Sequence, residues 1–286
     1  MRLIDPLQQS VYSVDTKDGR YYQHRDTGQK LWSVTTVLGR YLEANNDGGL
    51  EAWKERVGQE EAEGIKVQAG KRGSALHDIA EKYLNGQDWK TGQMPINLMT
   101  FQKFKRELDD SVSSIIAIEH ILWDHGELNV TEREFRTLAD NTTSAGPVLR
   151  IHPDSEGLGF GKSGPGDIGG LRESSTPTNE LAPKLPYNTA GRLDLLADYM
   201  GVRSIIDFKT ARRRKRREHI TGYYYQTEVY GQIANRLYNA GVRQTVVMIA
   251  DDDSPKPQIF ITPLGKYHEE VCKIFGDPAY NKPIGS

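Results

Sequence analysis

A predicted β-hairpin constrains the fold of this chain more than any other feature. Residues 189–210 read TAGRLDLLADYMGVRSIIDFKT, which is two strand-like runs separated by Met200 and Gly201. A turn centred between these two residues sets a register in which Asp194 lies directly opposite Asp207. Opposed side chains in a hairpin lie about 5 Å apart at Cβ, and two like charges there are destabilising. A bound cation would reverse that effect.

The second strand of this hairpin adds an ammonium group to the same patch. Side chains alternate along a strand, so Asp207 and Lys209 share one face while Ile206 and Phe208 point into the opposite layer. Mg²⁺ prefers a few carboxylate oxygens together with water and phosphate oxygens, and Mn²⁺ is a possible substitute. A lysine beside such a site can orient the attacking water and stabilise charge on phosphate. The alternative is that D-x-K is only a solvated strand end.

The order of the predicted elements favours an α/β fold with a central mixed β-sheet flanked by helices. A turn at residues 26–29, between two β-rich runs, predicts an N-terminal hairpin. Apolar periodicity separates the helical segments from the strands. Helices are expected within residues 49–84 and over 97–123, 219–238 and 267–275, and further strands over 129–137, 245–250 and 258–262.

One long segment has no hydrophobic period. Residues 139–188 are rich in glycine, serine and proline and contain few aromatic residues. This composition predicts a flexible insertion within a single domain that spans residues 1–286.

Overall composition excludes several classes of protein. The 39 acidic and 37 basic residues give a net charge of −2, so the whole chain is not typical of a nucleic-acid-binding protein. Cys272 is the only cysteine, which excludes a disulfide framework and an iron–sulfur cluster held by four thiolates. The sequence has no apolar run of 18 residues and no evident signal or transit peptide, so we expect a cytoplasmic protein with no membrane partner.

The positive charge is concentrated in one place. Residues 212–217 read RRRKRR and begin three residues after Lys209, which puts them at the mouth of the predicted site. Arginine side chains there can bind phosphates and guide a nucleic-acid strand toward a metal. The alternative is a solvated basic loop or a nuclear localisation signal. Further along, Tyr223 is expected to pack, whereas Tyr224 or Tyr225 could stack on bases.

These motifs resemble the RecB-like branch of the PD-(D/E)XK nuclease superfamily. The branch pattern G-x-x-D, D-x-K-T and Q-x-x-x-Y is matched by residues 191–194, by residues 207–210, and by Gln226 with Tyr230. Leu193 stands where the family name has proline. A G-x-x-x-H motif of the branch is matched by residues 73–77.

The resemblance implies a set of catalytic and metal-binding residues. Asp194, Asp207 and Lys209 are the expected catalytic residues. Asp194 and Asp207 would also bind the metal, together with His77 and the backbone carbonyl of Phe208.

A glutamate upstream of G-x-x-D joins the site in many relatives. Glu119, Glu132 and Glu134 are the candidates here, and Glu132 is ranked first.

The N-terminal part carries a finer resemblance. Residues 18–38 and 50–63 are similar to phage exonucleases and to the mitochondrial genome maintenance exonuclease. This similarity implies a Mg²⁺-dependent exonuclease that degrades single-stranded DNA from its ends in replication, repair or recombination. The expected contacts to DNA are Ser33 and Thr35 of an S-V-T motif, Arg72, Arg213, Arg214, Arg216, Arg217, Gln226 and Tyr230.

Two alternative functions remain open. One is a double-strand exonuclease or a structure-specific endonuclease. The other is a catalytically idle DNA-binding protein that assists recombination, although the intact set of Asp194, Asp207, Lys209 and His77 argues against it.

Overall fold

One mixed sheet organises the part of the chain that the structure describes. The computed structural model describes residues 10–45, 54–124, 187–282 and 284. Within them, eight strands form a sheet in the order β1-β2-β3-β5-β6-β7-β8, with β4 paired to β5 outside this path. The predicted α/β fold is confirmed. The strands are β1 (Val11–Thr16), β2 (Gly19–His24), β3 (Lys30–Ser33), β4 (Val112–Asp124), β5 (Thr189–Tyr199), β6 (Val202–Ala211), β7 (Gln244–Asp251) and β8 (Gln258–Pro263).

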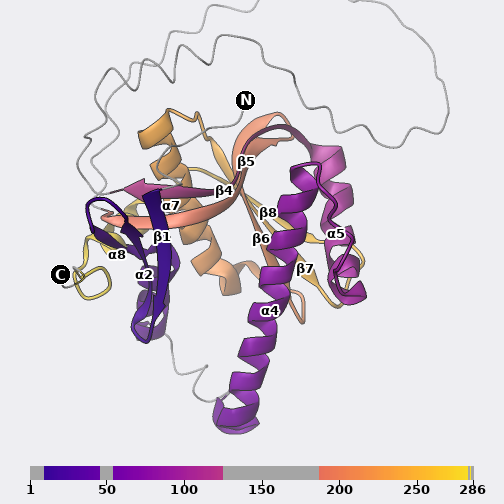
Figure 1. Cartoon of the computed structure of the whole chain (residues 1–286), viewed down its shortest axis with the longest axis horizontal. Coiled ribbons are helices and arrows are strands. Elements are labelled where there is room, and N and C mark those ends of the chain that lie inside the picture. The colour runs from indigo at the N-terminus through magenta and orange to yellow at the C-terminus, as the bar shows by residue number, and fades with distance from the viewer. Residues whose placement is uncertain (1–9, 46–53, 125–186, 283, 285–286) are drawn as a thin grey trace, which may run out of the picture.

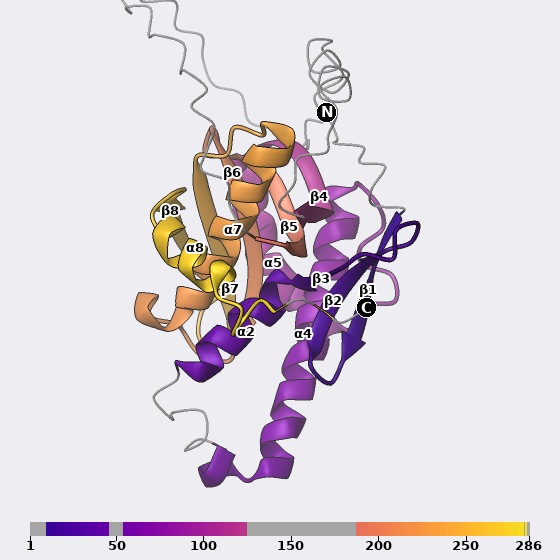
Figure 2. The same cartoon turned by 90° about the vertical axis from the view of Figure 1, so that its left-hand side faces the viewer.

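Helices cover both faces of this sheet (Figures 1 and 2). On one face, α4 and α5 bury a core around Leu76, Phe104 and Phe208. On the other face, α2, α7 and α8 bury a core that includes Val229 and Phe275. Among the described residues, no helix has the length and hydropathy needed to cross a membrane. The helices are α2 (Val34–Ala44), α4 (Gln59–Leu84), α5 (Pro95–Ser111), α7 (Thr221–Tyr238) and α8 (His268–Gly276), with a short 3-10 helix η1 (Arg217–Ile220) before α7.

Strand β5 changes its neighbour along one edge, and this change creates a fork in the sheet. β4 pairs along one edge of β5 from Thr189 to Tyr199. On the other edge, β3 pairs in parallel at the start of β5, and β6 pairs antiparallel only from Leu195 onward. None of the described strands pairs with residues 191–194 on that edge, because β3 has ended and β6 has not yet begun to pair. At the fork, backbone groups of β5 and β6 that a continuous sheet would pair with each other are free to bond side chains.

The helix predicted over residues 97–123 is wrong beyond Ser111. The structure ends α5 at Ser111 and continues directly into strand β4. Residues 112–123 read VSSIIAIEHILW, and their β-branched isoleucines suit a strand better than a helix. Antiparallel pairing with β5 provides the hydrogen bonds of β4. As a result, Glu119 lies on a strand beside Asp194 and not on a helix.

The other predicted elements agree with the structure wherever it describes them. The N-terminal hairpin is formed by β2 and β3, with an additional strand β1 on its outer side, and the closing hairpin is formed by β7 and β8. The predicted strand at 129–137 and residues 139–186 of the predicted insertion lie outside the described residues. The predicted insertion wrongly included Tyr187, because this residue is fully buried in the core against Phe275.

Candidate active site

The central hairpin has the register that its turn predicts. Pairs run from Tyr199 opposite Val202 to Leu195 opposite Ile206, and Asp194 and Asp207 occupy the next position on each strand. There the strands separate at the fork, and the Asp194 carboxylate accepts a hydrogen bond from the Phe208 backbone N–H at 2.7 Å. The carboxylate thus accepts from a backbone N–H of β6 that lies beyond the last residue pair between β5 and β6.

Three side chains from three elements meet beside this fork. His77 of α4 lies with its Nδ1 3.2 Å from Oε1 of Glu119 on β4 and 3.3 Å from Oδ1 of Asp194 on β5. One ligand atom from each residue lies within 4.8 Å of the others, a spacing at which they could hold one metal ion. Burial lowers the pKa of the His77 imidazole, but hydrogen bonds with Asp194 and Glu119 outweigh burial and raise that pKa to about 10. The carboxylates of Glu119 and Asp194 therefore produce a negative electrostatic potential that favours binding of a cation.

Glu119 is held in an unusual backbone conformation. Its φ is +48°, in the left-handed region that non-glycine residues rarely adopt, and such a conformation costs about 1–3 kcal/mol. Burial raises the pKa of its carboxyl group, and the hydrogen bond to His77 opposes this only in part. Strained residues of this kind gather at functional sites, where surrounding structure holds them. The sequence analysis favours Glu132 over Glu119 as the upstream glutamate of the site. Glu132 lies outside the described residues.

Buried Asp207 and half-buried Lys209 form an ion pair next to the three-residue cluster. The Lys209 ammonium lies 2.5 Å from Oδ2 of Asp207, and Oδ1 of Asp207 accepts a hydrogen bond from Nε2 of Gln226 at 3.0 Å. Burial raises the pKa of Asp207 to about 6, although Lys209 opposes the shift. In this structure the Asp207 carboxylate contacts Lys209 and Gln226. The role of the Phe208 backbone carbonyl as a metal ligand stays a prediction.

The glycine and the tyrosine of the two matched motifs are in contact. A Cβ atom added at Gly191 would lie 2.6 Å from Cε1 and 2.9 Å from the hydroxyl of Tyr230, closer than real Cβ atoms approach. Tyr230 of α7 is buried and fills the fork beside β5. Glycine is therefore required at position 191 because the ring packs against its backbone.

Gly191→Ala is expected to lower the free energy of unfolding by about 1–3 kcal/mol, because the added methyl group displaces the Tyr230 ring. Chemical denaturation measures this change. Gly64→Ala on α4 is the matched control, since nothing lies within 4 Å of its new Cβ, and alanine there should stabilise the helix by up to about 1 kcal/mol. Equal stability of Gly191→Ala and wild type would show that the contact is not tight in solution.

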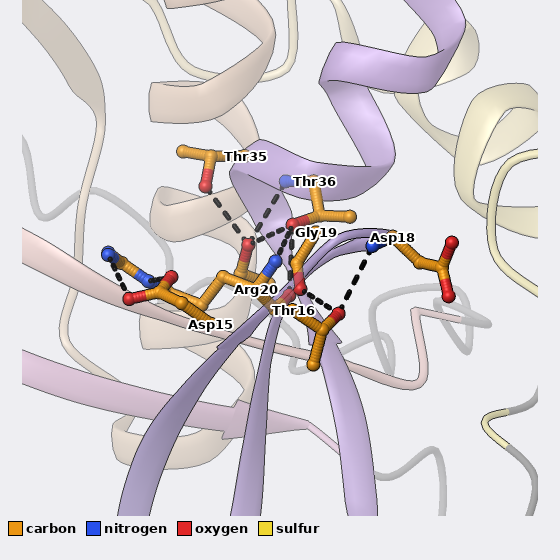
Figure 3. A network of polar contacts seen from close by, with 8 residues as sticks. Asp15, Thr16, Asp18, Gly19, Arg20, Thr35 and Thr36 are labelled. Atoms are coloured by element: carbon orange, nitrogen blue, oxygen red, sulfur yellow. Dashed lines mark hydrogen bonds and ion pairs between the residues drawn. The ribbon is translucent and has the colours of Figure 1, made fainter. Parts of the chain in front are cut away.

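The S-V-T motif has a structural role at the start of α2 (Figure 3). Ser33 is buried, and its Oγ accepts a hydrogen bond from the Thr36 backbone N–H at 3.0 Å, which caps the helix. The Thr36 hydroxyl in turn bonds both the N–H and the carbonyl of Arg20 at 2.9 Å, so the cap also fastens β2 to α2. Thr35 is exposed, and its hydroxyl oxygen lies 3.0 Å from the hydroxyl oxygen of Ser33. Of the two predicted DNA contacts, only Thr35 is at the surface.

The β7–β8 loop holds two of the predicted basic DNA contacts in place. Arg72 of α4 makes a two-pronged ion pair with Asp252, at 2.7 and 3.3 Å. The Arg214 backbone N–H donates to Asp253, and Gln258 bonds both backbone groups of Lys215. The backbone of the cation run is thus anchored, while residues 212–217 expose their side chains.

The tyrosines of α7 differ from their expected roles. Tyr224 and Tyr225 are buried at 4% and 8% exposure, so neither ring is available to stack on a base. Tyr224 stacks on Tyr267 instead. Tyr223, which was expected only to pack, lies beside the Lys209 ammonium with 5.3 Å between Nζ and the ring centre. Gln226 and Tyr230, predicted to contact DNA, are likewise buried and contact Asp207 and Gly191.

Sequence reasoning also passed over Arg192. It is exposed on β5, and its charge opposes the rise in the pKa of the Glu119 carboxyl. Its position two residues before Asp194 could have revealed it, because residues two apart on a strand share a face.

The comparisons with known proteins agree with this geometry. A family model described as the PD-(D/E)XK nuclease superfamily matches residues 43–273, a range that includes the His77, Glu119 and Asp194 cluster and the Asp207–Lys209 pair. A comparison with curated proteins gives no significant match. Nucleases of this superfamily use divalent metal ions, and the acidic cluster is a suitable place for one. Because the match covers most of the chain and the mixed sheet places the motif residues together, the chain belongs to the PD-(D/E)XK nuclease superfamily.

Proposed function

We propose that the protein is a Mg²⁺-dependent exonuclease that degrades single-stranded DNA from its ends. The observation that carries this proposal is the meeting of His77, Glu119 and Asp194 within 4.8 Å, directly beside Asp207 and Lys209. Two carboxylates and one imidazole can ligate a divalent cation, and the adjacent ammonium can stabilise charge on a phosphate, which together suit phosphodiester hydrolysis.

The residues present fit a hard divalent cation. Carboxylate oxygens are the preferred protein ligands of Mg²⁺, and an added imidazole nitrogen also suits Mn²⁺. In this assignment His77, Glu119 and Asp194 would hold the cation, and Asp207 on the neighbouring strand would complete the set. A divalent cation held there would neutralise charge on the scissile phosphate and make the attacking water more acidic.

The chain's own groups position the other reactants. Lys209 can donate hydrogen bonds to the attacking water or to a phosphate oxygen, and its positive charge stabilises the negative charge that develops during attack. Gln226 fixes the orientation of Asp207 by its hydrogen bond to Oδ1. The Phe208 N–H does the same for Asp194. Both aspartates of the site are therefore oriented by a second group before substrate binds.

The preference for single-stranded ends rests on the cation run and on the resemblance to single-strand exonucleases. The exposed side chains of residues 212–217 follow β6, the strand that carries Asp207 and Lys209. Basic side chains along a groove bind the backbone of a single strand without reading its sequence.

Cleavage of linear and circular DNA in Mg²⁺ tests this proposal. We expect single-stranded linear DNA, labelled at either end, to be degraded, while circular single strands stay intact and duplex DNA is degraded much more slowly. Cleavage of circles would identify an endonuclease, and rapid loss of duplex would identify a double-strand exonuclease. Binding of DNA without cleavage of any substrate would identify an idle accessory protein and overturn the proposal.

Neutralising the cation run should weaken DNA binding for all sequences alike. If about three of its arginines contact single-strand phosphates, the slope of log K against log salt should flatten by roughly 2, at about 0.7 per phosphate. Cleavage at saturating DNA should fall much less than affinity. The variant replaces these four residues by glutamine: Arg213, Arg214, Arg216 and Arg217.

A control with the same change in net charge separates local contacts from overall charge. The control replaces four exposed lysines elsewhere by glutamine: Lys17, Lys90, Lys266 and Lys273. Fluorescence titrations of a single-stranded oligonucleotide from low to moderate salt measure both slopes. If the two variants give the same slope as wild type, the run is a solvated loop that does not contact DNA.

A further inference from the structure

Tyr223 makes a contact with the site that no motif explains. Its ring lies beside the Lys209 ammonium, with 5.3 Å between Nζ and the ring centre. That separation is within the range of about 6 Å in which a cation is attracted to the face of an aromatic ring. Lys209 is 19% exposed at its side chain, so the attraction acts in a partly desolvated environment where it is stronger than in water.

The position of Tyr223 on α7 links it to the rest of the site. Residues three and four apart on a helix are neighbours on one face, so Tyr223, Gln226 and Tyr230 form a continuous row. Gln226 bonds Asp207, and Tyr230 packs on Gly191 at the fork. The same helical face that orients the carboxylate therefore also reaches the ammonium.

Lys209 needs more than one contact to stay in place. A lysine side chain has several rotatable bonds, and holding it in one geometry costs up to about 2 kcal/mol of conformational entropy. The Asp207 carboxylate provides one contact, at 2.5 Å. When a metal cation binds that carboxylate in place of the ammonium, the Tyr223 ring is the contact of Lys209 that remains among the residues that the structure describes.

We propose that Tyr223 is a positioning residue, whose ring face holds the Lys209 ammonium where it meets the attacking water or the phosphate. This inference rests on the proposed nuclease function, and it concerns the ring and not the hydroxyl. Tyr223→Phe keeps the ring face, whereas Tyr223→Leu keeps an apolar side chain without it. The two variants therefore separate the proposed role from hydroxyl chemistry.

Single-turnover cleavage at saturating Mg²⁺ and DNA gives the first readout. Tyr223→Phe should cleave DNA at a rate within twofold of wild type. Tyr223→Leu should cleave about tenfold more slowly, with unchanged DNA affinity. A tenfold loss of rate is the effect expected from the loss of one moderate cation–π contact. Equal losses in both variants would assign the effect to the hydroxyl and overturn the proposal. A loss confined to DNA affinity would make Tyr223 a binding residue and also overturn it.

Tyr225→Leu is the matched structural control. It removes a ring from the same helix, but that ring packs on Tyr41 and Tyr267 in the core. It should lower the melting temperature and leave the single-turnover rate of the folded protein within twofold. A tenfold slower rate in this control would show that any disturbed α7 impairs cleavage, which would contradict a specific role for Tyr223.

A second readout does not depend on activity. ¹⁵N relaxation of the Lys209 ammonium group should show greater mobility in Tyr223→Leu than in wild type or Tyr223→Phe. Equal mobility in all three proteins would overturn the inference even if the protein is a nuclease. If wild type cleaves nothing but the mobility changes as expected, the proposed function fails and the positioning contact stands.

Discussion

Replacing Lys209 by alanine is expected to lower the rate of DNA cleavage by about a thousandfold while DNA affinity stays within about twofold of wild type. Removal of one preorganised charge-stabilising donor from an active site typically costs 10²–10³ in rate. Asp207 and the Tyr223 ring hold the Lys209 ammonium in a fixed position. A water molecule that fills the space left by alanine carries no charge and is not held in the same position. Asp207→Asn should have an effect of similar size. Single-turnover cleavage and equilibrium binding, measured separately, check both variants.

A second ion pair in the same hairpin provides the control for these variants. Asp198 pairs with Arg203 at 2.6 Å near the turn, away from the fork. Asp198→Asn should leave cleavage within twofold, because it removes a carboxylate from the same hairpin without touching the site. Cleavage at the wild-type rate by Lys209→Ala or by Asp207→Asn would contradict the mechanism.

Glu119→Gln is expected to raise the Mg²⁺ concentration for half-maximal cleavage by more than tenfold. The change keeps the shape of the side chain but removes one of two carboxylates in the three-residue cluster. Loss of a ligand charge weakens binding of a hard cation, whereas the fold should persist because the hydrogen bond to His77 needs no charge on residue 119. Titration of activity with Mg²⁺, and direct calorimetric titration with Mn²⁺, measure the shift.

An exposed glutamate serves as the reference for this titration. Glu269 lies on α8, where it pairs with Lys273. Glu269→Gln should give the wild-type Mg²⁺ titration, since it removes the same charge far from the fork. An unchanged Mg²⁺ requirement in Glu119→Gln would remove Glu119 from the metal site and leave Glu132 as the sequence-favoured candidate.

The parts of the fold that local rules determine could be predicted from the sequence. The hairpin register follows from the turn at Met200 and Gly201, and the shared face of Asp207 and Lys209 follows from the two-residue period of a strand. Both depend on residues close in sequence. The separation of the strands at Asp194 could not be predicted, because it depends on β3 approaching the same edge of β5 from far away in the chain.

Glu119 shows why a tertiary contact can override a local pattern. Residues 112–123 contain leucine, alanine and glutamate in an arrangement that also suits a helix, so the predicted helix ran through them. Pairing with β5 makes the segment a strand and turns Glu119 toward Asp194. Because β propensity reflects packing against neighbouring strands more than the residues themselves, sequence alone could not decide between the two.

Motif residues were easier to find than their contacts. The motifs singled out Ser33, Gln226 and Tyr230 as DNA contacts, yet the structure uses Ser33 to cap α2, Gln226 to orient Asp207, and Tyr230 to pack on Gly191. A motif shows which residue types occur at a given spacing, whereas burial depends on the whole fold. For the same reason the sequence predicts only a packing role for Tyr223, whose ring contacts the Lys209 ammonium.

The metal dependence of cleavage decides whether the His77, Glu119 and Asp194 cluster is a catalytic metal site. The purified protein is treated with EDTA, dialysed, and incubated with end-labelled single-stranded DNA with and without added Mg²⁺. We predict no cleavage without added metal and full cleavage when Mg²⁺ is restored, since the His77, Glu119 and Asp194 cluster would then hold the cation. Cleavage at an undiminished rate in the presence of EDTA would contradict the account.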